Sequence, residues 1–212
     1  MTQQKRTRLA IFDLDGTLTP IESTWRYLHE ALGTWNLGKV TAEQYWSGLI
    51  DYESWARLDA EAWRGVDLSR VEQILGEIPY REGVHDTIAR LKSIGIEAGI
   101  VSAGLSLLAD RAARDLGIGL VAANRLLHRD GKLTGEVDVE VSLENKLTAM
   151  CRMADQLEVT LKDCVAVGDT VYDLPSQIGL RIAFNPRDNG SWQVADAVVC
   201  KNDLRAILDY LT

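Results

Sequence analysis

The sequence has few of the features that mark secreted, membrane-spanning or metal-thiolate proteins. Its 212 residues include three cysteines, Cys151, Cys164 and Cys200, which cannot all pair and share no metal-ligand spacing. We therefore expect buried thiols in a reducing cytoplasm. The longest uncharged run, Ala98–Ala109, has 12 residues and is too short to cross a bilayer. No membrane partner is expected.

Positive charge is also scarce. The chain has 23 lysines and arginines against 31 acidic residues, a formal net charge of −8, which argues against a nucleic-acid partner. An anionic substrate would need locally placed cations or a metal. The first residues, Met1–Arg8, are polar and basic, but the apolar run behind them ends at Asp13, so we expect no signal peptide.

The stretch Arg8–Pro20 holds the strongest local signal in the chain. Leu9–Phe12 is a short apolar run, too brief for a helix and typical of a buried strand. It ends at Asp13 and Asp15, and residues two apart in an extended backbone point to the same side. Both carboxylates should therefore face one point at the carboxyl end of the strand, where Gly16 allows a sharp turn. An Asp-Gly pair alone would indicate only a turn, but a second acid aimed at the same point indicates a site.

Residues 21–78 differ from the rest of the chain. They predict helices and no strong strand, and they hold five of the six tryptophans. Thr41 and Gln44 resemble a capping box at the start of one helix. So small a helical unit needs bulky residues for its core, so we expect most tryptophans to pack internally and one or two to line a pocket. The expected helices are Glu22–Leu32, Thr41–Ile50, Glu53–Arg64 and Leu68–Glu77.

From Tyr80 onward, strands alternate with helices, which predicts a parallel sheet. The expected fold is therefore α/β: a Rossmann-like parallel-sheet core of residues 1–20 and 79–212, with a helical cap, residues 21–78, inserted after the first strand. Asn124–Asp138 predicts a hairpin that turns at Asp130-Gly131. The other expected elements are strands at Ile96–Val101, Leu120–Ala123, Cys164–Val167 and Arg181–Phe184, and helices at Glu82–Ser93, Leu105–Leu116, from Ser142 to about Leu157, shortly after Asp169, and at Asn202–Leu211.

Polar side chains follow three of the predicted strands. Asp13 and Asp15 follow the first, Ser102 follows the second, and Asp169 with Asp173 follows a later one. Because the carboxyl ends of neighbouring parallel strands meet at one edge of a sheet, we expect these side chains to converge. Carboxylates from two strands, with little else to coordinate a metal, suit Mg²⁺.

The candidate cation at this edge is Lys146, in the first turn of its predicted helix. A serine hydroxyl such as that of Ser102, the neighbouring backbone N–H groups at a helix start and a lysine together suit a phosphate group. The pattern predicts phosphoryl chemistry with an aspartate nucleophile.

Four motifs in this order resemble the haloacid-dehalogenase-type phosphatases. They are D-L-D-G-T at 13–17, a second strand ending in serine, a downstream lysine, and G-D-x-x-x-D at 168–173. The helical insertion, I-V-S-A-G-L, and A-N-R-L with D-G-K-L-T-G-E-V resemble the phosphoserine-phosphatase branch of this superfamily. The resemblance covers nearly the whole chain. It implies a Mg²⁺-dependent cytoplasmic phosphatase of a small phosphorylated metabolite, first of all O-phosphoserine in serine biosynthesis, acting as a monomer or homodimer.

The resemblance also implies a role for each candidate residue. Asp13 would attack phosphorus and become an aspartyl phosphate. Asp15 would protonate the leaving alkoxide and later take a proton from water. Asp13, the backbone carbonyl of Asp15 and Asp169 would hold Mg²⁺. The remaining positions are Ser102, the N–H of Ala103 and Lys146 for the phosphate, Asp173 to support the metal or orient Lys146, and Glu22 and Arg57 for the substrate's amino and carboxylate groups.

Three departures from the branch keep other functions open. Ala103 and Tyr172 stand where the branch has glycine and asparagine, and neither Arg57 nor Arg64 aligns securely with its cap arginine. One alternative is a phosphatase or phosphotransferase for a sugar or another small phosphate. A non-enzymatic alternative is an aspartyl-phosphate receiver or a silent binding domain, which would not need the acid at Asp15. A dehalogenase would need neither Mg²⁺ nor that acid.

Overall fold

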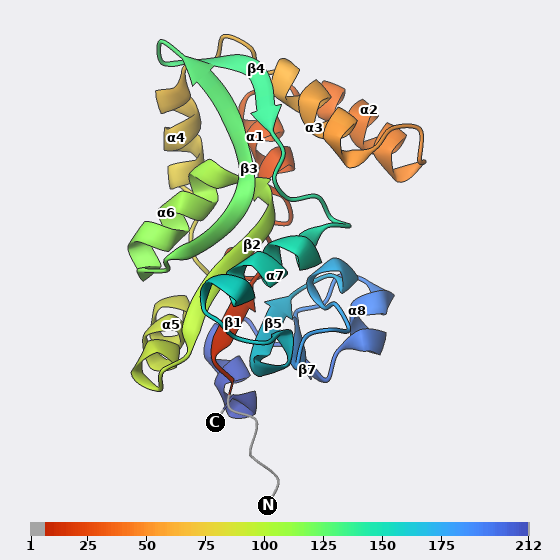
Figure 1. Cartoon of the computed structure of the whole chain (residues 1–212). Coiled ribbons are helices and arrows are strands. Elements are labelled where there is room, and N and C mark those ends of the chain that lie inside the picture. Colours follow the sequence, from red (N-terminus) through yellow and green to blue (C-terminus); the bar gives the residue numbers. More distant parts are fainter. Residues whose placement is uncertain (1–6, 212) are drawn as a thin grey trace, which may run out of the picture.

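The computed structural model describes residues 7–211, so most of the segment on which the signal-peptide expectation rests lies outside the described residues. Seven strands form one sheet in the order β4-β3-β2-β1-β5-β6-β7 (Figure 1). Neighbouring strands are parallel except for β3 and β4. The predicted α/β class with a Rossmann-like parallel sheet is confirmed. The strands are β1 (Leu9–Phe12), β2 (Glu97–Leu105), β3 (Leu120–Arg129), β4 (Lys132–Asp138), β5 (Cys164–Gly168), β6 (Leu180–Phe184) and β7 (Ala197–Val199).

The helices divide between the sheet and the segment that follows β1. In Figure 1, α7 crosses in front of the sheet, while α2 and α3 project from its upper end. Helix α6 packs against β2 and β3, and α7 packs against β2. The helices are α1 (Thr24–Ala31), α2 (Trp35–Trp46), α3 (Tyr52–Glu61), α4 (Leu68–Gly76), α5 (Val84–Ser93), α6 (Ser106–Leu116), α7 (Lys146–Gln156) and α8 (Asn189–Val194), with short 3₁₀ helices η1 (Leu161–Asp163), η2 (Val171–Asp173) and η3 (Leu204–Tyr210).

Strand β1 lies at the centre of the sheet, and all four of its residues are buried. A continuous apolar run is what a parallel strand covered on both faces requires. Phe12 pairs with Ile100 of β2 on one side and with Val167 of β5 on the other. The carboxyl ends of β1, β2 and β5 therefore lie side by side, and the polar residues after them meet at one edge.

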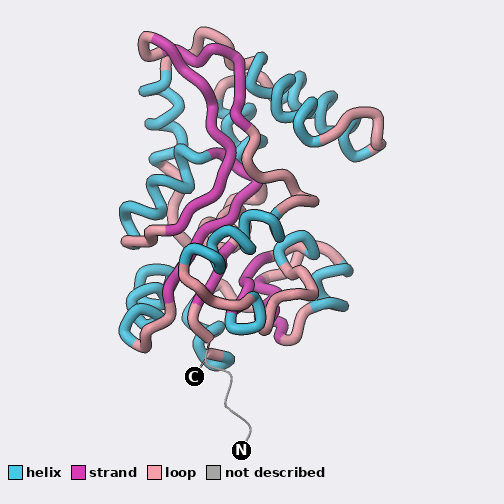
Figure 2. Tube along the Cα trace, in the orientation of Figure 1, coloured by secondary structure: helices cyan, strands magenta, loops and turns pink. Residues whose placement is uncertain are grey.

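The predicted hairpin is confirmed, and its two strands, β3 and β4, form one edge of the sheet. Asp130 and Gly131 both have positive φ, 51° and 75°, as a tight turn between right-twisted strands requires. The two strands run to the upper end of the molecule in Figure 2. There the Gly65 N–H donates to Leu133 O and the Leu133 N–H donates to Val66 O, both at 2.9 Å. The hairpin therefore supports the chain between α3 and α4.

Several predicted boundaries are wrong for identifiable reasons. Thr41 does not cap a helix but lies inside α2, where its hydroxyl hydrogen-bonds Gly38 O at 3.0 Å and Asp59 Oδ1 at 2.5 Å. Helix α7 begins at Lys146 rather than after Ser142. The expected terminal helix is the 3₁₀ helix η3. Helix α8, with six residues, and strand β7, with three, were not predicted because such short elements carry little periodicity.

The expectation of three buried thiols is confirmed only for Cys164. Cys164 is buried in β5, Cys151 is partly buried in α7, and Cys200 is exposed because it follows β7 into a surface loop. All three are free. Among residues 7–211, no helix is long and apolar enough to cross a membrane.

Candidate active site

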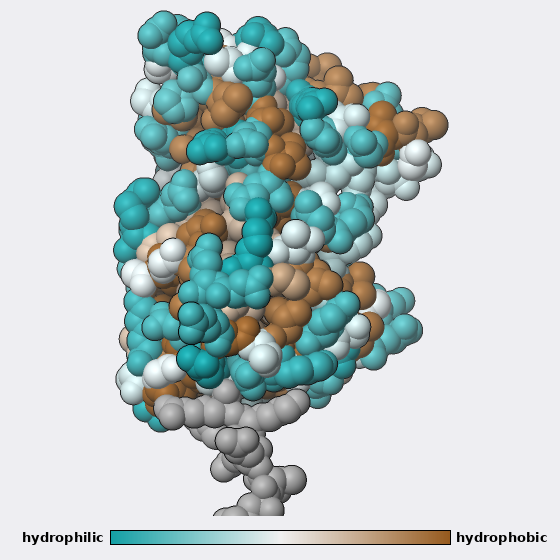
Figure 3. All heavy atoms as spheres, in the orientation of Figure 1, coloured by the Kyte–Doolittle hydropathy of each residue, from teal (hydrophilic) through white to brown (hydrophobic). Residues whose placement is uncertain are grey.

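A cavity of about 730 Å³ lies at the carboxyl edge of the sheet. Its lower wall comes from the ends of β1, β2 and β5 with α7 and η2, and its upper wall comes from α1, α2 and α3. In Figure 3 the outline of the molecule is notched on the right, between the projecting α2 and α3 above and α8 below. The lower wall of the cavity therefore carries the polar residues at the strand ends, and the helical insertion, residues 21–78, supplies the upper wall.

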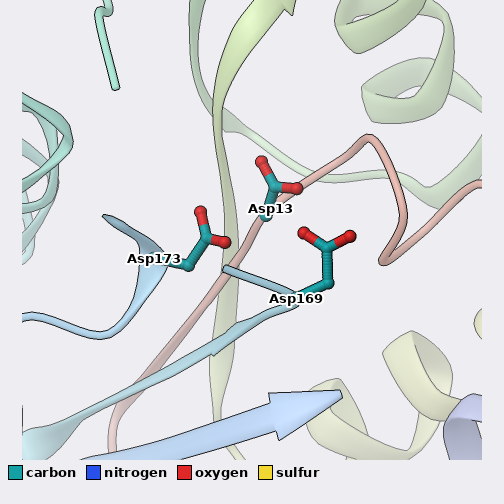
Figure 4. A group of neighbouring side chains, drawn as sticks. All are labelled: Asp13, Asp169 and Asp173. Carbon is teal, nitrogen blue, oxygen red and sulfur yellow. The ribbon is translucent and has the colours of Figure 1, made fainter. Parts of the chain in front are cut away.

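Three aspartates meet on the lower wall. Asp13 follows β1, Asp169 follows β5 and Asp173 ends η2, and one carboxylate oxygen from each lies within 4.8 Å of the others. Figure 4 shows the three carboxylates grouped around one point. All three side chains are buried. Sequence reasoning predicted this convergence from the strand ends.

Lys146, the first residue of α7, neutralises part of this charge. Its ammonium donates to Asp13 Oδ1 at 2.7 Å and to Asp173 Oδ1 at 2.5 Å. Burial works to lower the pKa of Lys146, but the charges of Asp13 and Asp173 outweigh it and hold that pKa above its usual value. The lysine is therefore charged and fixed beside Asp13, where a phosphate bound at Asp13 would meet it.

Asp15 points to a different partner. Thr24, the first residue of α1, donates its backbone N–H to Asp15 Oδ2 at 2.6 Å and its hydroxyl to Oδ1 at 2.5 Å. Burial raises the pKa of Asp15, although the Thr24 hydrogen bonds oppose the shift. A raised pKa favours the protonated form that a general acid needs. The two acids that are two residues apart in sequence thus have different environments and can take different roles.

Ser102 is buried near the end of β2 and lies on the same wall. The Gly104 N–H donates to Ser102 Oγ at 2.9 Å, which orients the hydroxyl. The strand expected to end at Val101 runs on to Leu105, with a register shift against β3, and the helix expected at Leu105–Leu116 begins one residue later, at Ser106. A Cβ on Gly104 would lie 2.9 Å from Asp15 Oδ2, so the close approach of this segment depends on glycine.

The carboxylate oxygens of Asp13, Asp169 and Asp173 could serve as ligands of a divalent cation. Asp169 Oδ2 is buried and accepts no hydrogen bond from any described residue, although the Arg187 side chain lies in ion-pair contact with it. Gly16, with φ of +84°, leaves room beside this oxygen, because a Cβ there would come within 1.9 Å of it. A buried carboxylate beside two others, on the side of the site that Gly16 keeps open, suits a ligand of Mg²⁺.

Burial raises the pKa of Asp169 to about 7, and the nearby Asp173 charge adds to the shift. In EDTA we therefore expect the unfolding temperature to fall as pH rises from about 5 to 7.5, by a few degrees, because the folded protein keeps a proton that the unfolded chain has lost. Thermal melts across this range measure the slope. Mg²⁺ should oppose the fall and Asp169→Asn should make it smaller, with the part due to Asp13 and Asp15, whose pKa values burial also raises, remaining. A melting temperature that rises with pH in EDTA would contradict this account.

The two predicted substrate-binding residues have different positions. Glu22 lines the cavity at its rim; its side chain is 69% exposed and lies 3.8 Å from Arg26. Arg57 is not among the residues that line the cavity, because it lies on the exposed side of α3, where it is paired with Glu53. The structure therefore brings Glu22 but not Arg57 to the site.

Sequence reasoning missed two polar residues and most of the upper wall. Thr24, which binds Asp15, gave no signal in the sequence. Arg187 donates to Glu22 O at 2.9 Å, and it follows β6, so the same strand-end rule that found Asp13 could have found it. Instead of one or two tryptophans, four of the five line the cavity, and Trp63 is the one that does not: Trp25, which is also buried, Trp35, Trp46 and Trp55 form the aromatic part of the wall.

Comparison with known proteins agrees with this arrangement. Residues 10–176 match the haloacid dehalogenase-like hydrolases, and the chain belongs to that family. A phosphoserine phosphatase from Methanocaldococcus jannaschii is 33% identical over 98% of this chain and 99% of its own. One from Wolinella succinogenes is 30% identical over 96% of this chain and 100% of its own.

Solved structures give the same result. A phospho-aspartyl intermediate analogue of phosphoserine phosphatase superposes with a TM-score of 0.85 at 30% identity, over 98% of this chain and 100% of the other. The predicted resemblance to the phosphoserine-phosphatase branch is therefore confirmed.

Proposed function

We propose that this chain is a Mg²⁺-dependent phosphomonoesterase that works through an aspartyl phosphate on Asp13. The family assigns it to the hydrolases of phosphoric monoesters. The observation that carries the mechanism is the contact of Lys146 with both Asp13 and Asp173, beside the carboxylate of Asp169. The names of its relatives make O-phosphoserine the first substrate to test.

In this mechanism the residues of the lower wall have distinct chemical roles. The Asp13 carboxylate attacks phosphorus while Lys146 and the Ser102 hydroxyl hold the phosphoryl oxygens. Asp15, held by Thr24, gives its proton to the leaving oxygen, and afterwards accepts a proton from the attacking water. Mg²⁺, held by Asp13, Asp169 and the backbone carbonyl of Asp15, would lower the repulsion between the nucleophile and the phosphate.

We further propose that residues 21–78 act as a cap on a core formed by residues 1–20 and 79–212. The support is that α1, α2 and α3 supply the upper wall of the cavity, and that Tyr45 of α2 donates to Glu144 Oε1, just before α7, at 2.5 Å. We place the activity in the cytoplasm, on a small soluble metabolite, with serine biosynthesis as its setting if phosphoserine is the substrate.

A steady-state assay against a panel of phosphorylated metabolites, with and without Mg²⁺, tests the proposal. Repeated turnover that stops in EDTA and returns with Mg²⁺ is the expected result. An aspartyl-phosphate receiver would instead release at most one phosphate per chain. Failure to turn over any monoester, p-nitrophenyl phosphate included, would contradict the proposal.

For Asp169→Asn we expect the Mg²⁺ concentration that gives half-maximal rate to rise at least about tenfold, with a lower rate at saturation. The reason is the loss of one anionic oxygen from the set of three. A Mg²⁺ titration of the rate measures both effects. Asp67→Asn, an exposed aspartate paired with Lys132, is the matched control and should titrate as the wild type does. An unchanged titration of Asp169→Asn would move the metal site elsewhere.

A further inference from the structure

Three aromatic rings and one carboxylate form a distinct part of the upper wall, and we name them the aromatic cage: Trp25, Tyr52, Trp55 and Asp59. All four line the main cavity and also a small inner pocket beside it. The Tyr52 and Trp55 rings meet edge to face, with centroids 5.7 Å apart. Nothing in the proposed mechanism uses these residues.

The cage lies next to the phosphate end of the cavity. The Trp25 indole N–H donates to Ala103 O at 3.0 Å, and the Tyr52 hydroxyl donates to the same oxygen. Asn124 Nδ2 also donates to it at 2.8 Å. Ala103 directly follows Ser102. A substrate with its phosphate at Ser102 would therefore need only a short carbon spacer to place a second group in the cage. These hydrogen bonds also fix the two rings before a ligand arrives.

The carboxylate of the cage is buried without a permanent cation. Asp59 is 2% exposed, and its one ion-pair partner among the described residues is His29, whose Nε2 lies 3.4 Å from Asp59 Oδ2 without forming a hydrogen bond. Thr41 donates to the other oxygen. A buried carboxylate with no lysine or arginine beside it is costly, and a cationic ligand would supply a permanent positive charge.

The cavity as a whole also favours a cation over an anion at this end. Of the described side chains that line it, six are carboxylic acids and only three are lysine or arginine: Arg26, Lys146 and Arg187. Lys146 and Arg187 are paired with aspartates of the lower wall, and Arg26 is exposed at the rim and paired with Glu30. A substrate carboxylate at the cage would face Asp59 with no free cation beside it.

We propose that the aromatic cage binds an N-alkylated ammonium group, so that the substrate is the phosphate monoester of an N-alkylated amino alcohol, such as choline phosphate, in preference to phosphoserine. The inference rests on the proposed function of the same site. A plain ammonium needs three acceptors, whereas the cage offers one carboxylate and three aromatic side chains. Alkyl groups on nitrogen contact those rings and spread the charge over them. Glu22, the acid first expected to bind the amine, is exposed to water at the rim, where a charge pair gains little.

The test compares kcat/KM for three monoesters: choline phosphate, 3,3-dimethylbutyl phosphate, which has the same shape without the charge, and O-phosphoserine. We expect choline phosphate to exceed each of the others by about tenfold or more. Asp59→Asn should lower kcat/KM for choline phosphate about tenfold and leave 3,3-dimethylbutyl phosphate within about twofold. Trp55→Leu, a change at a partly exposed ring, should lower the preference for the charged substrate similarly. Glu61→Gln, an exposed acid on the same helix, is the matched control and should change neither.

Equal rates on choline phosphate and its neutral analogue, or a higher kcat/KM for phosphoserine, would overturn the inference while leaving the phosphatase proposal standing. If the protein hydrolyses neither p-nitrophenyl phosphate nor any other monoester, the proposed function is wrong. The inference about the aromatic cage is then tested by ligand binding alone. Tryptophan fluorescence titrated with choline phosphate should then show a saturable change that Asp59→Asn weakens. The absence of a saturable change in the wild type would overturn the inference.

Discussion

Asp13→Asn should reduce turnover to background, a loss of at least roughly 10⁴-fold in kcat, as expected when a covalent nucleophile is removed. An amide cannot form the aspartyl phosphate, and the uncatalysed hydrolysis of a phosphate monoester is too slow to replace it. Steady-state kcat on p-nitrophenyl phosphate measures the loss. A variant that keeps more than about a tenth of wild-type turnover would remove Asp13 from the role of nucleophile.

The same substitution should leave the fold intact. The asparagine side-chain oxygen can still accept the hydrogen bond from Lys146 that Asp13 Oδ1 accepts now. Burial raises the pKa of Asp13 against the pull of Lys146, and Asp173 and Asp169 add to the rise, so the charged form is costly without a metal. We therefore expect a melting temperature in EDTA no lower than that of the wild type. A melt several degrees lower would mean that the lost activity reflects lost structure.

The loss of kcat caused by Asp15→Asn should depend on the leaving group of the substrate. An asparagine cannot donate the proton that an alkoxide needs, so kcat for alkyl phosphates should fall by about 10²–10⁴-fold. The rate of phosphoryl transfer from p-nitrophenyl phosphate to Asp13 should fall less, because nitrophenolate is stable without a proton. The second step still lacks its base, so a burst of nitrophenolate should precede slow turnover. Stopped-flow absorbance measures the burst, and Asp67→Asn serves as the control for loss of an acid elsewhere.

Equal losses of kcat on alkyl and aryl phosphates, with no burst, would contradict this role for Asp15. The hydrogen bonds from Thr24 would then serve to position the carboxylate for some other purpose, such as holding the first turn of α1 against the core.

The lower wall of the site could be predicted from the sequence because it depends on local rules. Asp13 and Asp169 each follow a short apolar strand and Ser102 lies near the end of another, and parallel strands of one sheet place such residues at one edge. Arg187 follows β6 in the same way and could have been included. Asp173 was predicted together with Asp169, and Lys146 was predicted from its place in the first turn of a helix, although α7 begins three residues later than a helix capped by Ser142 would.

The upper wall could not be predicted because it depends on how the helical insertion packs over the core. A tryptophan that lines a cavity and one that fills a core have the same size and the same helical spacing, so Trp55 and Trp63 look alike in the sequence. Asp59 gives no signal either, since its burial follows from the packing of α2 against α3. Arg57, two residues earlier, was the expected ligand, and the helical rotation between the two positions turns it outward.

The central claim is that phosphate passes through Asp13, and mass spectrometry of trapped enzyme tests it most directly. The Asp15→Asn variant is mixed with p-nitrophenyl phosphate and Mg²⁺, quenched in acid within the burst, digested, and the peptide that carries Asp13 is sequenced. This account predicts one added phosphoryl group on Asp13, absent from the Asp13→Asn, Asp15→Asn double variant. A phosphoryl group on another residue, or a burst with no modified peptide under conditions that preserve acyl phosphates, would contradict it.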